Sequence, residues 1–257
     1  MGKPVLLLRL EGPLQSWGGR SRWDVRDTQA EPTKSGIVGL LGCALGYGRG
    51  DVRLVEELDR GLRFGVRVEA PGRILEDYQT VTDFLPTAEG SYKHSGTKTG
   101  SSLARLRDDP DATPATIVSP RFYLEDAAFL VALEATDAAP LDLLTRSAAA
   151  LHRPIWPLFL GRKACAPTRP IFEELTDRYS SIDEALQRHP WAHLGSKMRP
   201  RPTPNGPLTA YVEAADGELT RQDAMRLNAA RQYDFRRAHQ LPPIPIASVL
   251  PPVSVEV

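Results

Sequence analysis

In the first half of the chain, hydrophobic positions switch between strand-like and helix-like spacing. The apolar run Val5–Leu10, which Gly12 and Pro13 interrupt, is typical of a buried first strand. Alternating apolar and polar residues at 64–69 predict a half-buried second strand. Two segments with helical spacing lie between these strands. The predicted helices cover residues 36–47, which Thr33 or Ser35 can cap, and residues 52–60.

The second half of the chain repeats this alternation after an irregular insertion. Residues 78–121 are rich in Gly, Ser, Thr and Pro and show little periodicity. Because a structureless loop of roughly 40 residues is rare inside a compact domain, we expect a functional inserted arm. Beyond the arm we expect strands at 127–135 and 208–213, helices at 140–151 and 181–188, and a basic segment at 221–240 that is helical at its start.

The order strand, helix, strand, insertion, strand, helix fits a βαββαβ unit. An α+β, ferredoxin-like fold is therefore predicted, and 257 residues are enough for one large domain or two small ones.

Composition narrows the functional classes. The chain has 32 Lys and Arg against 32 Asp and Glu, which argues against a histone-like basic protein and an acidic disordered chain. Two cysteines and scattered histidines offer neither a disulfide framework nor a metal-binding spacing, and no cofactor motif is visible. The sequence shows no signal peptide and no apolar run of ~18 residues, so we expect a cytoplasmic protein that does not span a membrane.

The zero net charge hides a segregated distribution. Residues 146–169 hold five Lys or Arg and no acid, and residues 185–207 hold four and no acid. The first 50 residues carry seven basic residues against four acidic ones. Basic segments free of acids suit a surface that follows phosphates, although each segment alone could be an ordinary solvated face.

Three short motifs could carry this chemistry. Lys34-Ser35-Gly36 opens a helix, where free backbone N–H groups favour an anion, although plain helix capping is the alternative. Trp17 and Trp23 interleave with Arg20 and Arg22 and could stack on bases or pack in the core. The third motif, Gly161-Arg162-Lys163, follows an apolar run. It could be a phosphate clamp or a strand end with exposed cations.

Three segments together resemble a known family. They are Leu6–Gly18, Pro32–Gly42 and Pro157–Cys165, in this order along about 160 residues. They are similar to the fifth-family Cas proteins of type I-E CRISPR interference complexes (Cascade), the CasD family. The part of the chain beyond about residue 176 matches only loosely.

The resemblance implies an RRM-like palm with an inserted thumb. On this chain the palm would comprise residues 1–77 and 121–257, the latter with a C-terminal extension, and the thumb residues 78–120. The resemblance further implies a non-catalytic subunit that holds the 5′ handle of the CRISPR RNA (crRNA). Such a subunit caps the backbone of CasC copies, contacts the large subunit CasA, and meets target DNA through the complex.

The motifs, the resemblance and the basic arm together give a set of expected RNA-binding residues. The set is Trp17, Gly18, Arg20, Arg22, Lys34, Ser35, Arg105, Arg107, Arg162 and Lys163.

Two alternatives remain open. Members of the same family in subtype I-C cut precursor RNA with a Tyr, a Lys and a His, and Tyr47, Lys93 and His94 could be arranged in that way. That arrangement would make the chain a metal-independent endoribonuclease. The other alternative is a purely structural adaptor whose basic segments meet acidic patches on neighbouring subunits.

Overall fold

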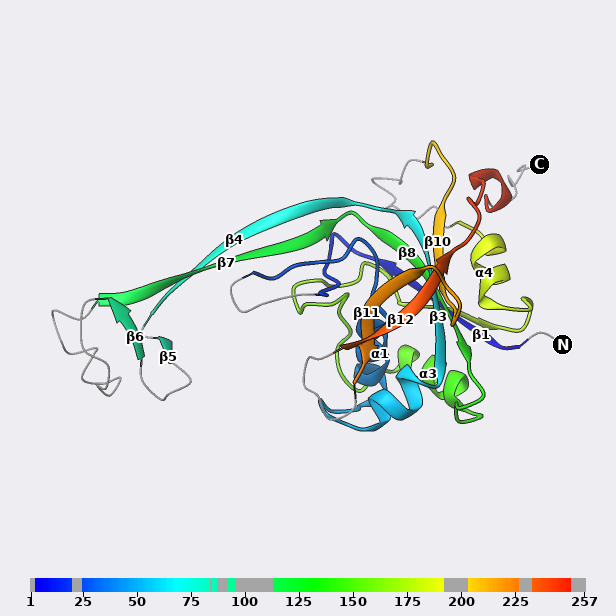
Figure 1. Ribbon diagram of the computed structural model, residues 1–257, viewed down its shortest axis with the longest axis horizontal. Helices are drawn as coiled ribbons and strands as arrows, with labels where there is room; N and C mark the ends of the chain where they lie inside the picture. The colour runs from blue at the N-terminus through cyan, green and yellow to red at the C-terminus, as the bar shows by residue number, and fades with distance from the viewer. Residues whose placement is uncertain are drawn as a thin grey trace.

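A seven-stranded antiparallel sheet forms the body of the protein, and a long two-stranded arm projects from it (Figure 1). The computed structural model describes residues 3–19, 25–83, 85–86, 92–95, 113–191, 203–226 and 233–250. The strands of the sheet lie in the order β11-β12-β10-β3-β8-β1-β9.

Four neighbouring strands of this sheet confirm the predicted ferredoxin-like fold. In chain order they are the first, second, third and fourth strands of the βαββαβ unit, and the sheet places them in the order 4-1-3-2. Each neighbouring pair is antiparallel. The unit comprises β1 (Val5–Glu11), α1 (Lys34–Leu45), β3 (Leu62–Ala70), β8 (Ala128–Ala135), α3 (Leu143–His152) and β9 (Phe172–Thr176).

Three further strands extend the sheet beyond β3. They are β10 (Thr209–Glu213), β12 (Tyr233–Gln240) and β11 (Leu219–Met225). The helix expected at the start of 221–240 is therefore wrong. The Arg, Gln, Ala and Met residues of β11 favour a helix locally, but pairing with β12, which continues the sheet from β10, overrides that preference.

Helices cover both faces of the sheet. Alternate residues of β1 point to opposite sides, so Leu6 and Leu8 pack with α1 and α3, whereas Val5 and Leu7 pack with α4 (Ile182–Arg188). A six-residue π-helical turn, Leu54–Asp59, stands where the second helix was expected. A 3₁₀ turn, Ile246–Ser248, follows the last strand.

The caps of two helices show how local sequence sets their starts. The side chain of Thr33 accepts a hydrogen bond from the backbone N of Gly36 at 3.2 Å, so Thr33 and not Ser35 caps α1. Ser181 caps α4 in the same way, as expected, by accepting from the backbone N of Glu184.

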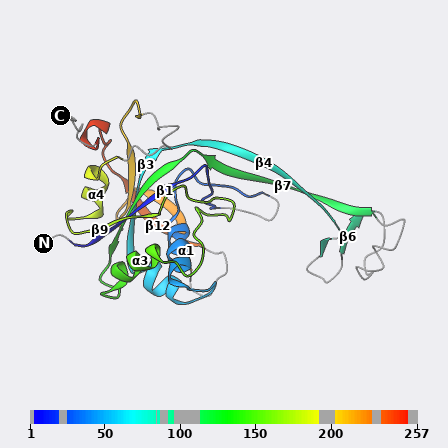
Figure 2. The same cartoon turned by 180° about the vertical axis from the view of Figure 1, so that it is seen from behind.

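The arm is a twisted ribbon of two long strands. β4 (Arg73–Asp83) pairs with β7 (Thr113–Glu125) in unbroken register from Arg73 opposite Glu125 to Asp83 opposite Ala115. Short strands β5 (Leu85–Pro86) and β6 (Tyr92–Ser95) lie at its far end (Figure 2). The sequence shows little periodicity here because most of β4 is exposed on both faces.

No helix among the described residues is long and apolar enough to cross a membrane.

Candidate nucleic-acid interface

Three sequence motifs converge where the arm leaves the body. The short strand β2 (Leu14–Gln15) follows β1 and pairs with Leu124 and Glu125 at the base of β7. The backbone N of Ser16 donates to the carbonyl of Leu160 at 3.0 Å. The segment after β1 is thereby fixed between the arm and the Gly161-Arg162-Lys163 motif.

Gly161 permits the closest contact between these motifs. Its φ is +99°, a conformation that side chains rarely adopt, and a Cβ added there would lie 1.8 Å from the carbonyl oxygen of Ser16. Glycine at this position is therefore required by both the backbone angle and the space.

Trp17 anchors the segment in the core. The residue is 1% exposed, and its Nε1 donates to Oε1 of Gln15 at 3.1 Å. Its ring lies against Gly36, where an added Cβ would approach the ring to 2.9 Å. In this conformation Trp17 links the first motif to the start of α1 and offers no free ring face to a base.

The start of α1 already holds carboxylates of the protein itself. The backbone N of Lys34 donates to Oδ2 of Asp223 at 2.7 Å, and the Lys34 ammonium lies 2.9 Å from Glu213. Asp223 also accepts from Arg236 at 2.7 Å. Burial raises the pKa of nearby Asp59, an effect that the Lys34 charge opposes. The helix start is thus docked onto β10 and β11, and Lys34 itself is buried.

Arg162 is half-buried and binds backbone oxygens. Its guanidinium donates to the carbonyls of Phe122 at 3.0 Å, Arg26 at 2.7 Å and Asp27 at 3.1 Å. It also lies over the ring of Tyr123, 4.8 Å from the ring centroid. Arg162 therefore joins the segment around residue 26 to the base of β7.

The remaining expected residues differ in their surroundings. Gly18 and Lys163 are exposed, and Ser35 is half-exposed. Arg20, Arg22, Arg105 and Arg107 lie outside the described residues.

The residues of the endoribonuclease alternative are not brought together. Tyr47 follows α1 in the body, where its hydroxyl lies 3.0 Å from Arg146 and 3.3 Å from Glu57. Burial, opposed by the Arg146 charge, raises the pKa of Tyr47. Lys93 and His94 belong to β6, at the opposite end of the arm (Figures 1 and 2).

Sequence reasoning missed the residues that hold the interface in place. Glu213 and Asp223 lie about 180 residues after Lys34 in the chain, yet they bind it directly. It also missed a cavity beside the start of α1, which Gln29 and Arg221 help to line. No local spacing links these residues, because β10 and β11 reach α1 only through the folded sheet.

The protein combines an RRM-like body with a long inserted ribbon, and the three motifs form a surface at the base of that ribbon. These features define its class, an RRM-like protein with an inserted arm. The family model of the CRISPR-associated protein Cas5 matches residues 5–240. The chain belongs to the Cas5 family, and the predicted resemblance is confirmed.

Individual relatives agree with this assignment. The chain is 33% identical over 180 residues to the CRISPR system Cascade subunit CasD of Escherichia coli (strain K12), covering 66% of this chain and 70% of that protein. A crystal structure of a Cas protein is similar with a TM-score of 0.63 and 32% identity, over 96% of this chain and 97% of that one. A chain from a CRISPR RNA-guided surveillance complex is similar with a TM-score of 0.65 and 29% identity, over 97% and 95% of the two chains.

Proposed function

We propose that this chain is a non-catalytic, RNA-binding subunit of a Cascade-type CRISPR surveillance complex in the cytoplasm. It holds the 5′ handle of crRNA, caps a backbone of CasC subunits beside CasA, and meets target DNA through the complex. The names of the relatives support the setting, since one is a Cascade subunit and another comes from an RNA-guided complex.

The convergence of the three motifs at the base of the arm is the observation that carries the proposal. It gathers the exposed Lys163 side chain, the exposed Gly18 backbone and the half-exposed Ser35 at the start of α1 from distant parts of the chain. Backbone groups and cations of this kind bind phosphates without reading sequence.

The ten proposed RNA-binding residues divide according to their surroundings. Gly18, Ser35 and Lys163 are accessible for direct contact. Arg20, Arg22, Arg105 and Arg107 are proposed as contacts on their charge alone. Trp17, Lys34 and Arg162 are engaged by the protein itself, so they would act mainly by positioning the segments that touch RNA.

A salt titration distinguishes residues that contact RNA from residues that only position the segments that contact it. Binding of handle RNA to the purified chain is followed by fluorescence anisotropy at several salt concentrations. Lys163→Ala removes one cation, so its salt slope should fall by about 0.7. Arg162→Lys keeps the charge but loses the forked hydrogen bonds, so binding should weaken with an unchanged slope.

Lys3→Ala is the matched control, because Lys3 is exposed and precedes β1, whose first residues lie away from the arm (Figure 1). Its affinity and slope should equal those of the wild type. If Lys163→Ala also leaves both unchanged, the phosphate contact at Lys163 is refuted.

The two alternatives have tests of their own. The chain should leave repeat RNA intact in EDTA, and specific cleavage that His94→Ala abolishes would instead establish an endoribonuclease. Crosslinking in the assembled complex should join RNA to residues 12–35 or 155–165. A complex without such crosslinks would favour the structural adaptor.

A further inference from the structure

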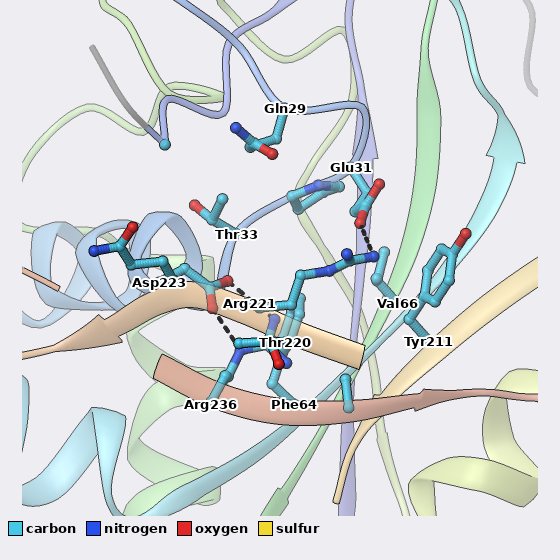
Figure 3. A pocket seen from close by; sticks show the side chains of 14 residues that line it. Gln29, Glu31, Thr33, Phe64, Val66, Tyr211, Thr220, Arg221, Asp223 and Arg236 are labelled. Carbon is cyan, nitrogen blue, oxygen red and sulfur yellow. Dashed lines mark hydrogen bonds and ion pairs between the residues drawn. The ribbon is translucent and has the colours of Figure 1, made fainter. Parts of the chain in front are cut away.

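A cavity of about 250 Å³ lies between the start of α1 and the outer strands of the sheet (Figure 3). The segment Gln29–Thr33 forms one wall, and β10, β11 and β12 form the other. Phe64 and Val66 give it an apolar floor. We call it the strap cavity. Its volume lies just below the ~300–1,000 Å³ of ordinary ligand pockets, which leaves room for one planar ring system.

The charges around the strap cavity cancel in pairs. Arg221 lies 2.7 Å from Glu31, and Arg236 lies 2.7 Å from Asp223. A phosphate would have to displace one of these carboxylates from its arginine. The cavity therefore favours an uncharged ring over an anion.

Two arginines that line the cavity each lie over an aromatic ring. The Arg221 guanidinium sits 5.1 Å from the centroid of the Tyr211 ring, and Arg236 sits 5.1 Å from that of Phe64. Aromatic rings and guanidinium planes are the surfaces on which proteins stack unpaired RNA bases.

Gln29 supplies a group that can read such a base. No hydrogen bond engages its side-chain amide within the described part of the chain, while its backbone N donates to Trp17 at 2.7 Å. The side chain rests against Gly19, where an added Cβ would lie 2.5 Å from Nε2. Figure 3 shows it at the cavity, opposite Phe64 and Arg236. A glutamine amide can pair with both N6 and N7 of adenine.

We propose that the strap cavity takes one unstacked adenine of the bound RNA, with Gln29 reading its N6–N7 edge and the Arg221 guanidinium, which lies over the Tyr211 ring, stacking on it. This inference rests on the proposed RNA-binding function. The cavity adjoins that interface directly, because Gly19 lines it two residues after Trp17. The site adds base selectivity to a surface that otherwise binds phosphates.

The experiment measures binding of the full chain to a labelled uridine oligomer of about 12 nucleotides by fluorescence anisotropy. A second oligomer carries one central adenine, and a third carries 7-deazaadenine, which lacks the N7 acceptor. Adenine should strengthen wild-type binding about tenfold, and the deaza substitution should remove most of that gain.

Gln29→Leu should bind all three oligomers alike, at the level of the uridine oligomer. Gln187→Leu, on α4 at the opposite face of the sheet, is the matched control and should keep the wild-type preference. If the wild type binds RNA but ignores both base changes, the adenine site is refuted and the proposed function stands. If the wild type binds none of the oligomers and no handle RNA, both fail.

Discussion

In the body, large side chains are buried on both faces of a sheet, whereas in the arm the apolar side chains of two paired strands stay exposed. Phe64 and Phe129 are at most 2% exposed, but Ile74 and Tyr78 on β4 are 59% and 65% exposed. The two regions therefore fold by different means. The body is stabilised by burial of apolar surface, and the arm is stabilised by backbone pairing between β4 and β7.

The body also buries charges that the described arm does not. Arg9 and Arg67 are at most 1% exposed, and both pair with Glu69, which is 2% exposed. Arg67 also donates to the carbonyls of Leu186 and His189 at 2.8 Å. These bonds join the middle of the sheet to the C-terminal end of α4.

Glu69→Gln should produce the largest loss of stability, because it leaves two buried guanidinium groups with one negative charge fewer. The expected cost is about 3–5 kcal/mol in the free energy of unfolding. Urea unfolding followed by circular dichroism measures it. The matched control is Glu56→Gln, since Glu56 pairs with Arg60 on the surface, with side chains 42% and 58% exposed. That change should cost less than about 0.5 kcal/mol, and equal losses in both variants would refute a structural role for the buried pair.

The same contrast explains which elements the sequence predicts. Val5–Leu10 and Ala127–Ala135 are apolar runs, interrupted only by Arg9 and Glu134, because both faces of their strands are covered, and the structure has strands at both places. Ser181 marks the start of α4 through its own side chain. Where a pattern reflects burial or a local hydrogen bond, sequence alone is sufficient.

Sequence reasoning fails where pairing partners lie far apart. The ribbon of β4 and β7 has no buried face along most of its length, so it leaves no alternating pattern. At the interface the sequence marks the motifs, but the carboxylates that bind Lys34 come from β10 and β11. The strap cavity depends on the same long-range contacts, and no spacing in the sequence marks it.

Acid should lower the stability of the body because it protonates Glu173. A hydrogen bond with His189, with the Arg9 and Arg169 guanidinium groups nearby, lowers the pKa of Glu173 from 4.5 to about 2. Because the folded-state pKa is lowered, the stabilisation is complete above about pH 4.5 and is lost as the pH falls towards about 2. A lowering of that size corresponds to about 3 kcal/mol.

Urea unfolding of the wild type and of Glu173→Gln over this pH range tests the expectation. The wild type should be the more stable protein near neutral pH, and the difference should shrink as the pH falls below about 4.5. A difference that stays constant down to about pH 2 would contradict the assignment.

Gly161→Ala probes the junction between body and arm. The added Cβ meets the carbonyl of Ser16, and the positive φ is strained for alanine, so we expect a cost of about 1–3 kcal/mol. RNA affinity should fall as well, because Lys163 lies only two residues after Gly161. Gly48→Ala is the control, since no atom lies within 4 Å of its added Cβ. Wild-type stability in Gly161→Ala would mean that the two motifs need not touch.

Two tyrosines on the paired strands allow the same substitution, Tyr to Thr, to be made in the body and in the arm. Tyr123 lies at the body end of β7 and is 4% exposed, whereas Tyr78 lies along β4 and is 65% exposed. Tyr123→Thr should cost roughly 3 kcal/mol, because it opens a cavity in the core and removes the ring beneath Arg162. Tyr78→Thr should change the free energy of unfolding of the isolated chain by less than about 0.5 kcal/mol, since threonine suits an exposed strand.

The register of the ribbon places Ile74 and Val118 on the same face as Tyr78, and all three are exposed. If this face is covered by a neighbouring subunit, Tyr78→Thr should weaken assembly of the complex while leaving the isolated chain unaffected. Size-exclusion chromatography of the co-expressed complex measures the first effect, and urea unfolding the second. A loss of stability in the isolated chain as large as that of Tyr123→Thr would show that the arm, like the body, is held by its own side chains.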